Sequence, residues 1–112
     1  MSAYIVIRVD IRDREAYGEY MLHTPRVVNQ YGGRFIVRGG ETETLEGEEE
    51  TLRIVLVEFP SMDDAKQFYR SEEYQAVKQL REGGGSAQIV AVDGYPIEDW
   101  DSVLEVSKEL SL

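Results

Sequence analysis

Only one side chain of this sequence belongs to the type that most often transfers protons near neutral pH. Histidine is that type, and His23 is the single histidine among the 112 residues. We therefore take His23 as a candidate general acid or base. The simpler alternative stays open, because Thr24 and Pro25 follow directly, as they would for a surface histidine at a bend in a helix.

A second group of candidates lies in stretches whose residues alternate between two faces, as they do in β-strands. Tyr4 and Glu58 are expected side by side where two of these strands pair, and together they could orient or deprotonate a phenolic ligand. Arg8 and Arg38 have no obvious acidic partner on the same face, except Asp10 near a strand end. Both arginines are therefore candidates to bind a carboxylate or another anion. Salt bridges to a partner subunit are the alternative for each.

Other kinds of chemistry are excluded by what the sequence lacks. There is no cysteine and one histidine, so thiolate nucleophiles, disulfides and multi-histidine metal sites within one chain are ruled out. The glycine runs 39–40 and 83–85 do not lie between a strand and a helix, as a phosphate-binding loop requires. A haem would need His23 as its axial ligand. We expect neither a metal nor a cofactor.

The charge balance excludes two classes of partner. Twelve basic against 22 acidic residues give a net charge of −10, whereas proteins that bind nucleic acid or anionic membranes need a basic surface. Much of the excess acid lies in residues 41–50 and 94–112, which we expect to be solvated. No apolar run approaches about 18 residues and the first residues lack a signal-peptide pattern, which indicates a soluble, cytoplasmic protein.

The candidates must be positioned by elements that the apolar pattern predicts. Alternating, largely β-branched residues predict four strands, over residues 3–10, 34–38, 51–59 and 86–93. A helix should begin at the cap Asp13 and end at Gly32, and Pro25 should kink it or restart it. A second helical stretch should begin at Ser61 and start afresh at Ser71.

This order of elements, β-α-β-β-α-β, is typical of an α+β, ferredoxin-like fold. In that fold a four-stranded antiparallel sheet is covered by helices on one face. We expect this domain to span residues 1–95. Residues 96–112 then form an acidic tail, in which a short helix is expected around residues 102–110.

The alternation also assigns residues to the two faces of the sheet. The face toward the helices should carry Ile5, Ile7, Val9, Phe35, Val37, Val55, Val57, Phe59, Val90 and Val92. The opposite face should carry the charged strand residues and an apolar patch of Val6, Ile36, Ile54, Leu56, Ile89 and Ala91. Leaving such a patch in water is unfavourable, and no further strand is predicted to cover it. We therefore predict a homodimer whose sheets pack face to face, with a cavity between them that holds the charged candidates.

Several ordered motifs resemble one bacterial family. They are Tyr17-x-x-Tyr20, the run from Gly32 to Gly40, Leu45-Glu46-Gly47, Glu58-Phe59-Pro60-Ser61 and Ser71-x-x-Tyr74. Over residues 2–95 the sequence is similar to the domain-of-unknown-function family 1330, in the dimeric α+β barrel superfamily. The resemblance implies a ferredoxin-like protomer and a sheet-to-sheet dimer. The superfamily includes cofactor-free quinone-forming monooxygenases, muconolactone-type isomerases and haem-binding proteins, but membership does not convey a reaction.

Two functions follow from these expectations. The first is a small cofactor-free enzyme that acts on a small organic anion or aromatic compound between the two sheets. In it Arg38 and Arg8 would bind the anion, and His23, Glu58 or Tyr4 would move protons. The second is a non-catalytic homodimer that binds a small ligand or serves a structural role.

Overall fold

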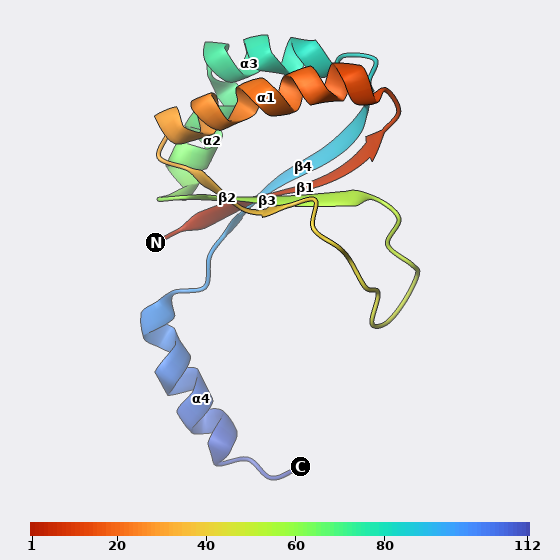
Figure 1. Cartoon of the computed structure of the whole chain (residues 1–112). Helices are drawn as coiled ribbons and strands as arrows, with labels where there is room; N and C mark the ends of the chain where they lie inside the picture. The colour runs from red at the N-terminus through yellow and green to blue at the C-terminus, as the bar shows by residue number, and fades with distance from the viewer.

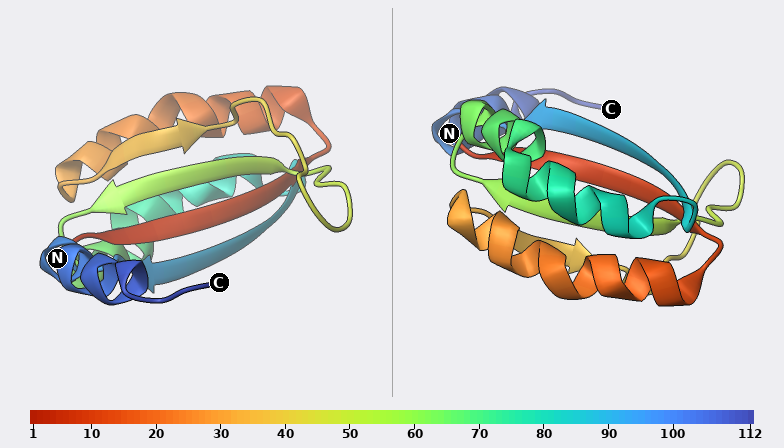
Figure 2. Two further views of the ribbon diagram at one scale, coloured as in Figure 1. Left: turned by 90° about the horizontal axis from the view of Figure 1, so that it is seen from below. Right: turned by 90° about the horizontal axis from the view of Figure 1, so that it is seen from above.

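The computed structural model describes all 112 residues, in eight regular elements and two short 3-10 turns. In chain order they are β1 (Ala3–Ile11), α1 (Arg14–Gln30), β2 (Arg34–Arg38), β3 (Arg53–Phe59), α2 (Met62–Arg70), α3 (Glu72–Lys78), η1 (Gln79–Arg81), β4 (Gly85–Asp93), η2 (Ile97–Asp99) and α4 (Trp100–Lys108). The four strands form one antiparallel sheet in the order β2-β3-β1-β4. Helices α1, α2 and α3 lie together over one face of it (Figures 1 and 2). The predicted ferredoxin-like α+β fold is confirmed.

The helices begin where the sequence predicts them. The Asp13 carboxylate accepts from the backbone N–H groups of Glu15, at 3.0 Å, and Ala16, at 3.2 Å. Ser61 and Ser71 cap α2 and α3 in the same way. Each such cap satisfies a backbone donor that the helix itself leaves unpaired, which is worth about 1 kcal/mol.

Helix α1 continues through Pro25 without restarting. Proline has no N–H, so it cannot donate the usual hydrogen bond to the carbonyl four residues earlier, which is that of Met21. The carbonyl of Tyr20, which directly precedes Met21, accepts a hydrogen bond from the hydroxyl of Thr24. The helix ends at Gln30, and Gly32, two residues later, has a φ of 80°, the left-handed conformation that glycine adopts without strain.

The core fills the space between the helices and the sheet. It joins 13 buried residues, namely Ile5, Val9, Tyr17, Tyr20, Val27, Val28, Val55, Val57, Phe59, Ala65, Phe68, Tyr74 and Val77. Phe59 is fully buried, and its ring lies 5.1 Å from that of Phe68. A side chain on Gly33 would collide with the same ring, since a Cβ there would lie 2.6 Å from it. This close approach fixes the end of α1 and the start of β2 against β3.

A β-bulge in β2 reverses part of the predicted facing. Phe35 pairs with Val57, but the next paired residue is Val37, which lies opposite Leu56, and Ile36 is the extra residue. Val37 therefore shares the uncovered face with Leu56, and Arg38 shares the helix-covered face with its partner Val55. The prediction that Arg38 lies on the uncovered face is wrong for this reason.

The facing predicted for β4 is also wrong. Val6 pairs with Val90 and Ile5 with Ala91, so Val90 and Val92 belong to the uncovered face, whereas Ile89 and Ala91 face the helices. The four consecutive apolar residues 89–92 offer no alternation from which the orientation could be read. The uncovered face remains apolar after the exchange, because Val90 and Val92 take the places of Ile89 and Ala91.

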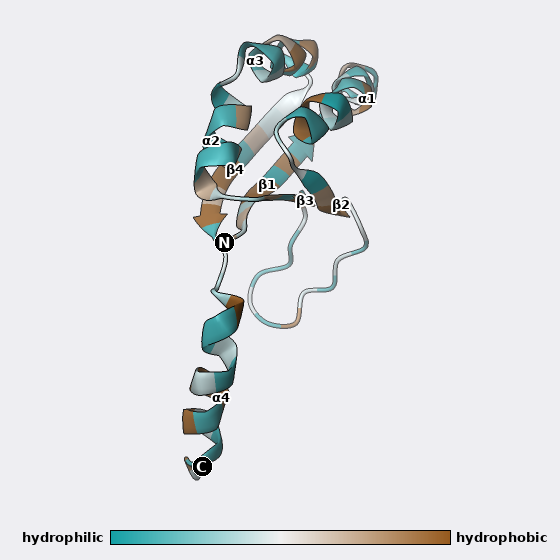
Figure 3. Cartoon of the chain, turned by 90° about the vertical axis from the view of Figure 1, so that its left-hand side faces the viewer, coloured by the Kyte–Doolittle hydropathy of each residue, from teal (hydrophilic) through white to brown (hydrophobic).

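The C-terminal helix α4 extends away from the sheet on its uncovered side (Figure 1). It spans Trp100–Lys108, so both of its ends lie two residues before those of the helix predicted around residues 102–110. None of its residues is buried, and Trp100 at its start is 54% exposed. Hydrophobic residues recur along it among hydrophilic ones (Figure 3). No helix of the structure is both long enough and apolar enough to span a membrane.

Candidate functional site

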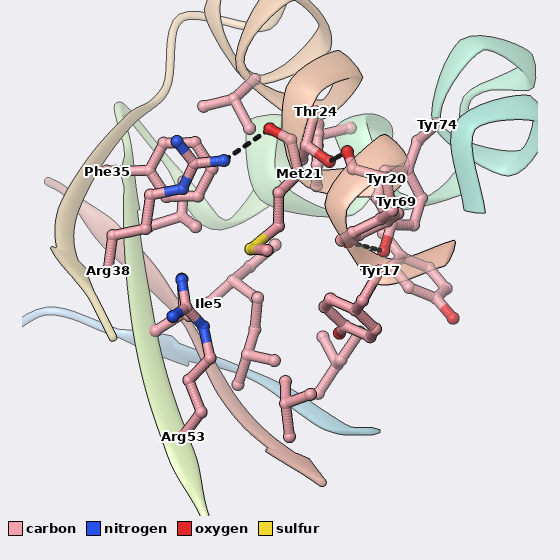
Figure 4. Close-up of a pocket in the computed structure, with 17 residues that line it drawn as sticks. Ile5, Tyr17, Tyr20, Met21, Thr24, Phe35, Arg38, Arg53, Tyr69 and Tyr74 are labelled. Carbon is pink, nitrogen blue, oxygen red and sulfur yellow. Dashed lines mark hydrogen bonds between the residues drawn. The ribbon is translucent and has the colours of Figure 1, made fainter. Parts of the chain in front are cut away.

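A cavity lies between α1 and the helix-covered face of the sheet (Figure 4). Fourteen of its 17 lining residues are hydrophobic, and they come from all four strands and from α1, α2 and α3. The free space inside is about 30 Å³, which is room for about one or two water molecules. The cavity is therefore a small gap in the core packing. Two of its lining residues, Arg38 and Arg53, are nevertheless charged, which is unusual in a hydrophobic core.

Two arginines stand at the mouth of this cavity. Arg38 comes from the end of β2 and Arg53 from the start of the neighbouring strand β3. Figure 4 shows both guanidinium groups pointing toward Met21. The ion pairs of the structure all involve other residues, so neither arginine has a carboxylate within salt-bridge distance.

The Arg38 guanidinium is held by two contacts. Its Nη2 donates to the carbonyl oxygen of Met21 at 2.6 Å. Its central carbon lies 4.3 Å from the centre of the Phe35 ring, within cation–π distance. Arg53 instead lies against Gly39, where a Cβ would come within 2.1 Å of its Nη1. Glycine at position 39 thus makes room for the second arginine.

Outside the mouth lies a shallow depression on the surface of α1. Met21, Arg38 and Arg53 line both the depression and the cavity, so these three side chains separate the cavity from solvent. Two carboxylates of α1, Glu15 and Glu19, also line the depression. Neither forms an ion pair with an arginine at the mouth.

Three tyrosines form another wall of the cavity. The hydroxyls of Tyr20 and Tyr74 are hydrogen-bonded at 2.8 Å, and Tyr17 lies beside Tyr20 with ring centres 5.2 Å apart. Burial raises the pKa of all three, and in Tyr74 the neighbouring Tyr20 raises it further. These hydroxyls therefore stay protonated at neutral pH and act as hydrogen-bond donors or acceptors rather than as bases.

Arg81 lies behind the tyrosine wall. Its guanidinium carbon is 5.1 Å from the centre of the Tyr20 ring, and its buried Nε has no hydrogen-bond partner. Burial lowers the pKa of Arg81, but the hydrogen bond with Tyr74 and the electrostatic interaction with the neighbouring tyrosines outweigh it, so the net shift is upward. The arginine thus places a fixed positive charge beside the tyrosine hydroxyls.

The predicted contact between Tyr4 and Glu58 forms on the uncovered face of the sheet, as expected, and so it lies away from the cavity. Tyr4 donates to Oε2 of Glu58 at 3.2 Å, and Nε of Arg34 donates to Oε1 at 2.9 Å. Both contacts follow from the strand pairing, which places Glu58 beside Tyr4 on one side, as predicted, and beside Arg34 on the other. The sheet separates this cluster from the cavity.

Two further candidates lie away from the cavity. Arg8 forms a salt bridge of 2.7 Å with Glu50, which belongs to the acidic loop before β3. The expectation that Arg8 lacks an acidic partner is therefore wrong. His23 is exposed on α1, 3.8 Å from Glu19, and it does not line the cavity. Among the five predicted site residues, the structure brings only Arg38 to the cavity.

Sequence reasoning missed Arg53 and Arg81. A signal for Arg53 exists, because it precedes Val55 and Val57 at the same alternation and so belongs to the helix-covered face, where a charge is unexpected. Arg81 lies in a short 3-10 turn, where no periodicity indicates which way its side chain points.

Comparison with solved structures gives relatives of the same fold. A protein of unknown function from Rhodopseudomonas palustris superposes with a TM-score of 0.68 at 17% identity, covering 85% of this chain and 83% of its own. SnoaB, a cofactor-independent oxygenase from Streptomyces nogalater, gives 0.61 at 8% identity, covering 85% and 94%. A dimeric protein of unknown function with a ferredoxin-like fold from Bacteroides fragilis gives 0.52 at 16% identity, covering 83% and 96%.

At these identities the structural relatives show the fold alone. A search among curated proteins gives no match. The family comparison reaches further, since one family model matches residues 2–95, from the start of β1 to just beyond the end of β4. The chain therefore belongs to the family described as domain of unknown function DUF1330.

Proposed function

We propose that this protein binds a small organic anion with an apolar, aromatic body in the cavity between α1 and the sheet. The observation that carries the proposal is the pair of arginines, Arg38 and Arg53, which stand without acidic partners at the mouth of an apolar cavity. In a chain with 22 acidic residues, two neighbouring guanidinium groups that none of them neutralises favour an anion from outside.

The cavity must widen to admit such a ligand. An apolar cavity that takes up benzene measures about 150 Å³, whereas the free space here is about 30 Å³. Met21 is half-buried and lies between cavity and solvent. Because a methionine side chain is unbranched and adapts its shape at low cost, its displacement is the simplest way to open the space.

The lining also limits the chemistry. No aspartate, glutamate or histidine lines the cavity, and burial holds Tyr17, Tyr20 and Tyr74 in the protonated form. A reaction there would have to start from a substrate that ionises readily by itself, such as an acidic phenol or enol. Arginines at the mouth would favour that anion, and tyrosine hydroxyls could donate hydrogen bonds to it.

One catalytic candidate fits this limit. SnoaB, which shares the fold, is a cofactor-independent oxygenase. By analogy, a bound naphthol anion would react with dioxygen, gaining one oxygen atom as a carbonyl while the other leaves as water with the hydrogen of that ring carbon and one proton from solvent. The alternative is a binding module that performs no reaction. Oxygen uptake in the presence of a naphthol distinguishes the two, since a binding module consumes none.

Calorimetric titration with naphthoate, and with neutral naphthamide of the same shape, tests the binding proposal. Arg38→Ala and Arg53→Ala should each weaken naphthoate binding by about tenfold or more and leave naphthamide binding unchanged. Arg12→Ala removes an exposed arginine paired with Asp10 and is the matched control. Equal binding of naphthoate by all these proteins, or no binding by the wild type, would refute the proposal.

A homodimer is the second part of the proposed function. The uncovered face of the sheet carries an apolar patch of Val6, Ile36, Val37, Ile54, Leu56, Val90 and Val92, of which Val90 is 48% and Val92 46% exposed. Covering it with the same face of a second copy would remove this area from water. The ferredoxin-like relative from Bacteroides fragilis is described as dimeric, which supports this arrangement. The Tyr4–Glu58–Arg34 cluster would then lie within the interface.

A further inference from the structure

Pro25 lies inside α1, where it removes one hydrogen bond of the helix. In an uninterrupted helix the N–H of residue 25 would donate to the carbonyl of Met21. Proline has no such donor, and it is the least favourable residue in a helix interior. The helix nevertheless continues for five residues beyond it.

The carbonyl that Pro25 leaves free is the one that Arg38 uses. Nη2 of Arg38 donates to the Met21 oxygen at 2.6 Å, from a strand that begins only after the helix has ended. A guanidinium has five N–H donors, so this contact occupies one and leaves the others for a ligand. The Phe35 ring supports the same group, with the guanidinium carbon 4.3 Å from its centre.

Without this acceptor, Arg38 would have other partners nearby. Arg38 is exposed, and the depression that it lines also contains the carboxylates of Glu15 and Glu19. An exposed arginine that is free to move would pair with one of them, which would neutralise the positive charge at the mouth. The Met21 carbonyl holds the guanidinium without neutralising it, because a carbonyl carries no net charge.

We propose that Pro25 is a positioning residue for anion binding: by denying the Met21 carbonyl its helical partner, it creates the acceptor that holds Arg38 at the cavity mouth. This inference rests on the proposed function for its purpose, although the contact itself does not depend on it. Because Pro25 works against the helix, its replacement should stabilise the protein while weakening the site, and a merely structural proline would not show these opposite effects.

The test is Pro25→Ala, with Arg26→Ala as the matched control at the adjacent exposed position. We expect Pro25→Ala to raise the melting temperature and to weaken naphthoate binding by roughly fivefold to tenfold, with naphthamide binding unchanged. In an Arg38→Ala background the same substitution should have no further effect on naphthoate. Binding within twofold of wild type, or the same loss in both backgrounds, would overturn the inference.

A second readout is independent of the ligand. In the wild-type protein the Arg38 side-chain N–H signals should be resolved by NMR and protected from exchange, and in Pro25→Ala that protection should be lost. Persistence of the protection would overturn the inference. If wild-type protein binds no naphthoate, the proposed function fails while this measurement still decides the role of Pro25. Pro25→Ser, which also restores the N–H, replaces the alanine variant if that variant does not fold.

Discussion

The arginines on the two faces of the sheet differ in whether they have carboxylate partners. On the uncovered face Arg8 is paired with Glu50 and Arg34 with Glu58. On the helix-covered face Arg38 and Arg53 have no carboxylate partner, although two glutamates of α1 line the same depression. Charge on the first face is therefore neutralised within the chain, and charge on the second remains available to a ligand.

The faces differ in packing as well. The helix-covered face forms the core, and Val57 and Phe59 there are 1% and 0% exposed. The uncovered face is apolar without being buried in a single chain, as Val90 and Val92 illustrate. Substitutions on the first face should therefore reduce the stability of the fold, and those on the second should affect association.

The largest effect is expected at Phe59. Phe59→Ala removes a fully buried ring that packs against Phe68 and Gly33, so it should lower the free energy of unfolding by about 3–5 kcal/mol. Urea titration measures the change. Val92→Ala, on the uncovered face, is the comparison and should cost less than about 1 kcal/mol when measured on the separated protomer. Similar losses for both variants would contradict the proposed difference between the faces.

A charge on the uncovered face should separate the proposed dimer. Val90→Glu places a carboxylate within the apolar patch, beside Val6, and burying it unpaired would raise the dissociation constant by about a hundredfold or more. Sedimentation velocity over a range of concentrations measures the shift. Ala76→Glu introduces the same charge at an exposed position of α3 and should leave association unchanged. A wild-type protein that sediments as a monomer at micromolar concentration would refute the dimer itself.

The tyrosine wall should make the helix-covered face sensitive to alkali. Burial raises the pKa of Tyr74 in the folded state, so Tyr74 contributes stability that is complete below the unfolded value of about 10 and is lost as pH rises above it. Tyr74→Phe should reduce the fall in unfolding free energy above about pH 10. Tyr95→Phe, at an exposed tyrosine, should retain the wild-type fall. An equal pH dependence in all three proteins would contradict the assignment.

The smallest effect is expected at the salt bridge of the uncovered face. The hydrogen bond from Arg8 lowers the pKa of Glu50, so its contribution is present above the unfolded value of about 4.3 and is lost as pH falls through the lower folded value. Glu50→Gln should therefore flatten the acid side of the melting-temperature profile slightly, because the pair is exposed. Glu49→Gln, at the preceding loop position, should reproduce the wild-type profile.

The sequence predicts the elements of this protein better than it predicts the facing of their side chains. Caps such as Asp13 and Ser71 act through local hydrogen bonds, so residue type and position suffice to find them. The contact of Tyr4 with Glu58 could also be predicted, because β1 and β3 pair without interruption.

The site itself could not be predicted in full, for reasons that differ from residue to residue. The bulge at Ile36 inserts one residue without any glycine or proline inside the strand to mark it, and so the facing of Arg38 was inverted. Glu50 reaches Arg8 from a loop 42 residues further along the chain, where no periodicity applies. His23 has the right chemistry, but the turn of α1 directs it outward to Glu19.

The bulge in β2 also decides which side of the sheet is cationic. If all five residues of β2 alternated regularly, Val37 would face the helices and Arg38 the opposite side. The composition of the strand would be the same, yet the mouth of the cavity would lose one of its two guanidinium groups. Deleting Ile36 would remove the bulge but keep the present facing, because Val37 would then follow Phe35 directly and Arg38 would still lie on the helix-covered face.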